Sequence, residues 1–281
     1  MSIISIKNLT KRANLKNKLD NFINLLAKSS LNYHDFLQKA SDIEELTDII
    51  EPKNLADWRL LGLELERSQN GKIMMPTRFR DFNEQVFCIV DIETSGGINS
   101  GQIIEIGAVK IQGGKEIGRF ETLVWASEVP QNISELTGIY QFDLIGAPRL
   151  ANALEKFRLF LGDAVFVAHN VNFDYEFISL SLAKQGFGML LNRKICTIDL
   201  ARRTIESHRY GLGALKQILG IDNAHHRALN DAIAACEIFK ECIKRLPWHI
   251  QSVEDLILFS KTAKTLRVPK MSEQADLAKQ I

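Results

Sequence analysis

The sequence predicts an α/β protein in which helices cover a mixed β-sheet. Three strand-like segments follow one another at 86–92, 102–111 and 115–124. The last two are joined by Gly113-Gly114, a pair typical of tight hairpin turns. Helical and strand-like segments then alternate toward the C-terminus. Antiparallel strands followed by alternating strands and helices are typical of a mixed sheet flanked by helices.

The alternating part is identified by its apolar periodicity. A period near 3.6 residues indicates a helix, and a short continuous apolar run bounded by polar residues indicates a buried strand. The expected elements are a helix at 150–161, a strand at 164–169, a helix at 172–185, a short helix after ICTIDL at 195–200, the segment GLGALKQILG at 211–220, and a long helix at 227–246.

The pattern of residues 1–82 indicates a separate small α+β unit. Its first 28 residues carry six basic side chains against one acid. Helical spacing in Leu19-Phe22-Ile23-Leu26 is followed by short helices at 33–40 and 42–50, the second opened by Ser41 as a helix N-cap. An alternating segment then turns at Asn70-Gly71, which is a hairpin signature. Two readings stay open: a winged-helix-like module that contacts nucleic acid or a protein, or a small cap on the main domain.

The main domain is expected over 83–247, and residues 248–281 form a third segment. Here an amphipathic helix begins after Ser252 and a polar tail follows. The stretch EDLILF at 254–259 resembles the short peptides that dock on bacterial sliding clamps. Its apolar residues fall equally well on one face of a helix.

The composition is that of an ordinary globular protein, with 46% hydrophobic and 25% charged residues. No apolar run reaches membrane-spanning length, and the first residues lack a secretory signal, so no membrane partner is expected. The four cysteines have no metal-ligand spacing and lie in apolar segments, which predicts reduced thiols in a cytoplasmic protein. The net charge of +1 neither indicates nor excludes nucleic-acid binding.

The stretch FCIVDIETSGG at 87–97 drives an apolar strand into two carboxylates. Because side chains two residues apart on a strand share a face, Asp91 and Glu93 are expected to lie side by side at the end of a buried strand. Two such charges repel each other unless a positive charge lies between them, and a divalent cation would supply it. A strand that ends in an ordinary polar turn is the alternative.

Two later segments supply further acidic side chains. Asp174 lies at the start of the helix that follows the strand in VAHNVNFD, although an acid there is also favoured by the helix dipole alone. Asp231 lies one turn into the long helix that begins in HHRALNDA. His226 lies in the loop just before this helix, where a solvated loop histidine is the alternative.

These residues compose a candidate site of four carboxylates and one histidine, each at the end of a core element. Oxygen donors without a Cys/His cluster suit Mg²⁺ or Mn²⁺ rather than zinc. Such ions, held in pairs about 3.5–4 Å apart, are the usual device for in-line attack on a phosphodiester. The sequence therefore predicts Mg²⁺ or Mn²⁺ as cofactor, with two ions in the site.

Three separated motifs resemble the DEDD exonuclease family in its histidine-containing branch, best known from the epsilon proofreading subunit of bacterial DNA polymerase III. The motifs are VDIETSGG, HNVNFD and HRALNDA, in the family's order and spacing. The linking segments IIEIGAV, ISELTGI and CTIDLAR match as well, so the resemblance covers about residues 84–246. It implies a ribonuclease-H-like fold and the removal of nucleoside monophosphates from a 3′ end.

The resemblance also implies a role for each reactive side chain. Asp91, Glu93 and Asp231 would hold the metal ion through which the attacking water is activated. Asp91 would bridge to a second ion on the leaving-group side, and Asp174 would complete that second site. His226 would take the proton from the attacking water. An imidazole ordinarily titrates near neutral pH, which suits this role.

Two neighbouring residues are candidates for substrate contacts. Thr94 follows the first carboxylate pair, where the family places contacts to the terminal nucleotide. Phe173 is expected to line the same pocket, with a place in the core as the alternative. The implied substrate is a single-stranded or frayed 3′ end of DNA, with RNA as an alternative.

Three functions stay open from the sequence. The first is a 3′–5′ DNA exonuclease of replication or repair, of the proofreading type. The second is an exoribonuclease like ribonuclease T or oligoribonuclease, because the choice depends on contacts to the 2′-position. The LTGI segment resembles DNA-directed members and favours DNA. The third is a non-catalytic nucleic-acid-binding module. A DNA polymerase subunit and a sliding clamp are the candidate protein partners, although the chain has about 80 residues ahead of the exonuclease motifs, unlike the epsilon subunit.

Overall fold

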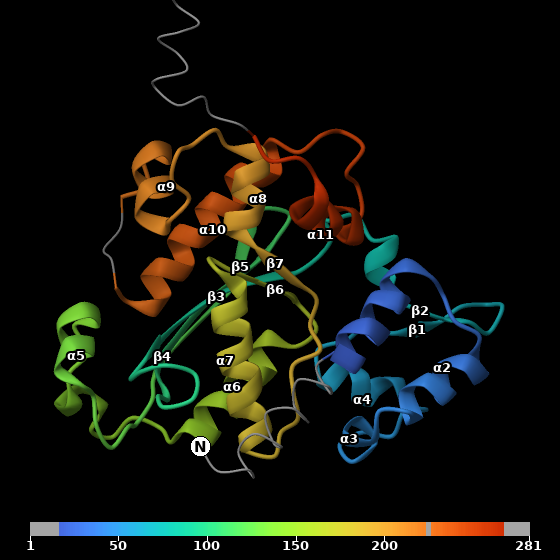
Figure 1. The fold of residues 1–281 in the computed structure, drawn as a ribbon, viewed down its shortest axis with the longest axis horizontal. Helices are drawn as coiled ribbons and strands as arrows, with labels where there is room; N and C mark the ends of the chain where they lie inside the picture. Colours follow the sequence, from blue (N-terminus) through green and yellow to red (C-terminus); the bar gives the residue numbers. More distant parts are fainter. Residues whose placement is uncertain (1–16, 223–225, 267–281) are drawn as a thin grey trace, which may run out of the picture.

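The computed structural model describes residues 17–222 and 226–266, and its centre is a five-stranded mixed sheet (Figure 1). The strand order is β5-β4-β3-β6-β7. β3, β4 and β5 pair antiparallel in succession, and β6 and β7 run parallel to β3. The strands are β3 (Phe87–Thr94), β4 (Ile103–Gln112), β5 (Lys115–Leu123), β6 (Val165–Ala168) and β7 (Lys194–Cys196). The predicted mixed sheet is confirmed.

The two faces of the sheet have separate cores, because successive side chains of each strand point to opposite sides. Phe87 and Ile89 of β3 belong to the core under α8–α11, whereas Cys88 and Val90 belong to the core under α6 and α7. The helices are α6 (Leu150–Leu161), α7 (Val171–Lys184), α8 (Thr197–Thr204), α9 (Leu212–Leu219), α10 (Ala228–Lys244) and α11 (Val253–Thr262). Each predicted strand and long helix lies within two residues of its expected bounds.

Short elements depart from the expectations. The segment ICTIDL divides between β7 and α8, because β7 pairs over only three residues with the short β6. The sequence did not predict α5 (Gln131–Thr137) or the 3₁₀ turn η2 (Gln141–Leu144), which follow β5. Both are shorter than the two or more turns that a helical period needs to be visible.

The N-terminal unit contains the predicted short helices and hairpin. A helix over 17–28 precedes α2 (Tyr33–Ser41), α3 (Glu44–Thr47) and α4 (Leu55–Leu60), and the hairpin consists of β1 (Glu66–Arg67) and β2 (Ile73–Met74). The helix expected at 42–50 is reduced to α3, and Ser41 closes α2 instead of capping α3. No side chain caps the start of α3, which leaves this helix one turn long.

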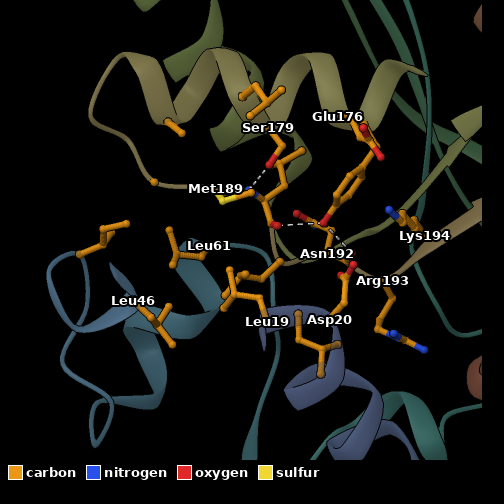
Figure 2. Close-up of a pocket in the computed structure, with 18 of the residues that line it drawn as sticks. Leu19, Asp20, Leu46, Leu61, Glu176, Ser179, Met189, Asn192, Arg193 and Lys194 are labelled. Atoms are coloured by element: carbon orange, nitrogen blue, oxygen red, sulfur yellow. Dashed lines mark hydrogen bonds between the residues drawn. The ribbon is translucent and has the colours of Figure 1, made fainter. Parts of the chain in front are cut away.

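The N-terminal unit packs directly on the sheet domain. Leu191, in the segment between α7 and β7, is buried in the unit's own core, and its backbone N–H donates to the carbonyl of Leu61 over 2.8 Å. Arg59 of α4 pairs with Asp163 at 2.6 Å. A cavity of about 670 Å³ remains at this junction, where Leu19 and Leu46 face the 189–194 segment and α7 (Figure 2). The contacts favour the cap among the two readings of this unit.

The C-terminal helix α11 is part of the same body. Ser252 caps it as predicted, accepting from the backbone N–H of Asp255 at 3.1 Å. Leu256 and Ile257 are buried in the core beside α10. Glu254 accepts hydrogen bonds from Thr77 and Arg193, which ties α11 to both the N-terminal unit and the residue just before β7. EDLILF is therefore helical in the structure, with Leu256 and Ile257 in the core and Leu258 58% exposed, and a sliding clamp as partner stays a prediction.

Two further expectations concern the cysteines, which were predicted to be reduced, and the helices, none of which was expected to span a membrane. All four cysteines are free, and burial raises the pKa of Cys88 and Cys236 to about 12. Within residues 17–222 and 226–266, no helix combines the length and apolar character needed to cross a bilayer.

Candidate active site

The first two carboxylates lie at the end of the central strand β3. Asp91 and Glu93 continue the alternation of Phe87 and Ile89, so both face the side of the sheet that α10 covers. Asp91 pairs with Gly107 of β4, and Glu93 pairs with Glu105. The expected side-by-side placement is confirmed.

Gly107 allows α10 to begin against the sheet. A Cβ atom at Gly107 would lie 2.1 Å from the backbone nitrogen of Leu229 and 2.2 Å from the carbonyl carbon of Ala228. Only a glycine permits so close an approach of two backbones. As a result Asp231, in the first turn of α10, reaches the end of β3. One carboxylate oxygen from each of Asp91, Glu93 and Asp231 lies within 4.8 Å of the others.

Asp174 reaches the cluster from α7, on the other side of the sheet. Asn170 has a left-handed backbone, with φ of 76°, which turns the chain from β6 into α7. Asp174 is 3% exposed, and nearby backbone N–H groups, its own and that of Ile92, partly offset the effect of burial on the pKa of its carboxyl group. Its charge raises the pKa of Asp91, so the two carboxylates are close neighbours, although Asp174 lies outside the tight group of three.

The cluster concentrates negative charge in a buried place. Burial, reinforced by Asp174 and Glu93, raises the pKa of Asp91 well above its ordinary value. Burial, with Glu105 and Asp231, raises the pKa of Glu93 to about 7. Burial raises the pKa of Asp174 to about 8, against the effect of its backbone hydrogen bonds. Like charges that converge out of water in this way favour either protons or a cation.

Glu105 is a buried acid that the sequence reading did not single out. It is fully buried, and its Oε1 accepts from Nε and Nη2 of Arg227 at 2.9 and 2.6 Å. Its Oε2 accepts from the backbone N–H of Ala228 at 2.9 Å. Glu105 therefore fixes the start of α10 to β4. The signal was the lone acid inside the apolar run IIEIGAV, together with the arginine in HRALNDA.

His226 lies on the rim of the cluster. Its side chain is exposed, its backbone is left-handed with φ of 62°, and its backbone N–H donates to Oδ2 of Asp231 at 3.2 Å. The loop histidine thus lies directly beside the third motif carboxylate. Its neighbour His225 lies outside the described residues.

The two expected substrate-contact residues lie on the elements that carry the carboxylates: Thr94 at the end of β3 and Phe173 in the first turn of α7. Thr94 ends β3, and its hydroxyl donates to the carbonyl of Gly96 over 2.9 Å. Phe173 lies one residue before Asp174 and is 40% exposed, with its ring 5.8 Å from that of Phe177. The ring of Phe173 is thus partly exposed at the start of α7 and partly packed on the core residue Phe177, and its contact with a nucleotide stays a prediction.

The donor set fits a divalent cation. The three converging ligand groups are all carboxylates, and Asp174 adds a fourth next to Asp91. Hard oxygen ligands of this kind suit Mg²⁺ or Mn²⁺. A cation would also relieve the repulsion that otherwise drives these carboxylates to bind protons. The strand alternation, the glycine contact and the helix start thus build one candidate metal centre.

A comparison with protein families identifies the domain that carries this cluster. The RNase_T exonuclease family model matches residues 88–239, a span that contains all four carboxylates and His226. The chain belongs to this exonuclease family. The match confirms the resemblance inferred from the three motifs, and the mixed sheet is the ribonuclease-H-like architecture expected of it.

Relatives of this exonuclease domain occur within much longer proteins. A PolC-type DNA polymerase III of Thermotoga maritima is 37% identical over 169 residues, which cover 59% of this chain and 12% of the polymerase. A bifunctional exonuclease/endonuclease protein of Mycobacterium tuberculosis is 35% identical over 188 residues, covering 63% of this chain and 29% of that protein. The chain therefore corresponds to a small part of these relatives.

Solved structures share the fold of the exonuclease domain. Exonuclease X in complex with 5′ overhanging duplex DNA aligns with a TM-score of 0.50 at 22% identity, over 62% of this chain and 99% of that one. Exonuclease I of E. coli in complex with an oligonucleotide aligns with a TM-score of 0.52 at 17% identity, over 58% and 42%. Both alignments leave more than a third of this chain outside the shared fold.

A substitution at Gly107 tests how the cluster is assembled. Gly107→Ala should push the start of α10 off the sheet, because the added Cβ would overlap backbone atoms that have no room to move. We expect a lower melting temperature and a smaller rise in that temperature on adding Mn²⁺. Gly118→Ala is the matched control, because its Cβ would lie 3.4 Å from a Phe160 ring carbon, away from the cluster. Equal Mn²⁺ responses in the two variants would contradict this role.

The raised pKa values predict how stability depends on pH when cations are removed. The folded protein holds protons on Glu93 and Asp174 up to about pH 7 and 8, whereas the unfolded chain releases them near its ordinary values of 4.5 and 3.8. Stability should therefore fall as pH rises through this window, because the folded state binds more protons there.

The measurement is the melting temperature in EDTA between about pH 5 and pH 8.5. Glu93→Gln should flatten the decline, because it removes one titrating group, and Mn²⁺ should reverse it in the parent protein. Glu237→Gln, at an exposed carboxylate paired with Lys240, should leave the slope unchanged. A flat profile for the parent protein would show that the cluster carries no such strain.

Proposed function

We propose that this protein is a metal-dependent 3′–5′ exonuclease that removes nucleoside monophosphates from the 3′ ends of DNA. The observation that carries the proposal is the convergence of Asp91, Glu93 and Asp231 within 4.8 Å, from two elements far apart in the sequence. Membership of an exonuclease family supports the reaction type. Relatives named as PolC-type DNA polymerases support a role in replication or repair, of the proofreading kind.

Each reactive side chain has a proposed role. Asp91, Glu93 and Asp231 would hold one divalent ion, and Asp91 with Asp174 would hold a second. Mg²⁺ or Mn²⁺, two per site, would supply charge stabilisation to the phosphate. His226 takes the proton of the attacking water. Its place on the exposed rim, with its backbone tied to Asp231, supports this role because the imidazole has room to approach a bound strand end.

The remaining residues of the centre hold these groups in place. Glu105 and Arg227 fix the peptide segment that carries His226 and Asp231, because the ion pair closes on the N–H of Ala228. Thr94 and Phe173 contact the terminal nucleotide of a single-stranded or frayed 3′ end. The exposed ring of Phe173 supports a base contact, since bases stack on aromatic side chains.

DNA is favoured over RNA by the LTGI resemblance and by the names of the relatives. An exoribonuclease with the same centre is the second candidate, because the two differ in contacts to the 2′-hydroxyl. A non-catalytic binding module is disfavoured, because all four carboxylates and His226 are present at the cluster.

The wider organisation is also proposed. Residues 83–247 form the exonuclease domain, residues 1–82 a cap on it, and residues 248–281 a C-terminal helix and tail. The hydrogen bonds of Glu254 to Thr77 and Arg193 support the cap reading. A DNA polymerase subunit is the proposed protein partner, and reduced thiols support a cytoplasmic location.

The first test of this function is Asp91→Asn. The full chain should shorten a 5′-labelled single-stranded DNA from its 3′ end in Mg²⁺ or Mn²⁺, with EDTA stopping the reaction. Asp91→Asn should reduce degradation to background, because it removes the ligand shared by both proposed ions. Near-normal activity in this variant would show that the site is wrongly assigned. Faster degradation of a matched RNA would favour the exoribonuclease instead.

The second test concerns the general base. His226→Ala should keep the fold and the Mn²⁺-dependent rise in melting temperature, yet lose about 10²–10⁴ in rate, the usual range for a removed general base. His225→Ala is the matched control and should be nearly as active as the parent protein. Equal losses in both variants would contradict the assignment of His226.

A further inference from the structure

The end of α5 and the segment that follows it expose large apolar side chains next to the proposed active site. Leu136, Tyr140, Phe142 and Ile145 are all exposed, Phe142 to 67% and Ile145 to 78%. Four such residues within ten positions form a concentrated patch, and patches of this kind mark interaction sites. None of these four side chains takes part in the carboxylate cluster.

Tyr140 and Phe142 are arranged as a pair of parallel rings. Their centroids lie 5.5 Å apart and their planes differ by 6°. The backbone beneath them is held firmly: the N–H of Tyr140 donates to Oδ2 of Asp143 at 2.8 Å, and Gln141 donates to the carbonyl of Ala126 at 2.8 Å. The rings are thus presented to solvent on a fixed turn, η2, rather than on a free loop.

The turn is anchored at the edge of the cluster. Ile139 and Leu144 are buried against Ile104 of β4, in a small core of their own. The next residue, Glu105, lies opposite Glu93 in the strand register. Figure 1 shows α5, which leads into this turn, beyond β4 on the side where α10 begins.

Electrostatics gives the same placement. Glu105 chiefly raises the pKa of Arg227, and Asp143 of η2 adds to this effect. Asp143 is therefore near enough to Arg227 for their charges to interact. The turn that carries the patch thus lies near Arg227, and the carboxylate cluster lies next to Glu105, the ion-pair partner of Arg227.

We propose that Tyr140 and Phe142 form a stacking platform for the unpaired bases of the strand whose 3′ end enters the carboxylate cluster. The inference rests on the proposed function and adds a second contact point for the same substrate. Every base has a π-face, so a ring pair beside the cluster binds unpaired nucleotides without regard to sequence.

The charges near the rings favour bases over phosphates as the contact. Glu135 and Asp143 flank the patch, and carboxylates repel a phosphate backbone. Exposed apolar side chains can also bind a partner protein, which is the alternative to nucleic acid at this patch. The position beside the cluster favours the nucleic acid, because a strand end held by the carboxylates brings its neighbouring nucleotides to this edge.

The test measures KM and kcat of the full chain on a 5′-labelled single-stranded DNA. Tyr140→Ala/Phe142→Ala should raise KM about 10-fold and leave kcat within about twofold, because stacking binds the strand without taking part in the chemistry. Leu159→Ala, at an apolar side chain of α6 that is 75% exposed, is the matched control and should change neither value. Melting curves should coincide for all variants, since each side chain faces solvent.

Two further arms identify the occupant. Phe142→Trp should keep the parent KM, whereas Phe142→Leu should raise it, because only the first retains a π-face. A DNA in which the nucleotides preceding the 3′ end lack bases should be a weaker substrate for the parent, and the double alanine variant should weaken it no further.

The outcomes separate this inference from the proposed function. An active parent protein whose KM is unchanged by the double variant would overturn the platform and leave the function standing. A Phe142→Leu variant that behaves like the parent would also overturn it, and would favour a protein on this patch. A parent protein that degrades neither DNA nor RNA would overturn the function itself.

Discussion

The main constraint on this structure is the repulsion between the carboxylates at the end of β3, which the rest of the fold has to withstand. Asp91, Glu93 and Asp231 lie within 4.8 Å of one another, with Asp174 behind Asp91. Left to themselves, such groups would push α10 and α7 away from the strand. They are held by contacts that do not involve the charges: the backbone approach at Gly107, the Glu105–Arg227 pair, and the apolar cores on both faces of the sheet. The fold thus keeps in place a group of acidic side chains whose repulsion either bound protons or a cation can relieve.

The sequence predicted the parts of this arrangement that follow from local periodicity. The apolar run before Asp91 and Glu93 indicated the central strand and the shared face, and the long helical period indicated α10. Glu105 was missed because its partner, Arg227, is 122 positions away, and no local pattern reports such a pair. Gly107 was missed for the same reason, since only the folded chain shows which backbone it meets. The helix expected at 42–50 is shorter than predicted, because α3 has no side-chain cap and ends after one turn.

The segments outside the matched family are joined to it through a few well-placed groups. The carboxylate of Glu254 in α11 accepts hydrogen bonds from the hydroxyl of Thr77 and from the guanidinium of Arg193. The side chains of Glu254 and Arg193 are both nearly buried. Breaking a buried ion pair from one side is strongly destabilising, by about 3–5 kcal/mol. The C-terminal helix, which sequence inspection places outside the exonuclease domain, therefore connects the N-terminal unit to the start of β7. Leu256 and Ile257 of EDLILF face the core, which accounts for the apolar character of these two positions.

The position of β3 in the sheet has a consequence for how such a sequence can change over time. β3 is bonded on both sides, antiparallel to β4 and parallel to β6, and its carboxylates are placed by odd-and-even alternation alone. Deletion of one residue of β3 ahead of Asp91 would turn Asp91 and Glu93 to the opposite face of the sheet, although the amino-acid composition would hardly change. A substitution in β3 changes one side chain and leaves the others on their faces, whereas an insertion or deletion shifts every side chain that follows it. The number of residues in β3 is therefore constrained by the placement of its carboxylates, and we expect changes in chain length to fall in loops rather than in this strand.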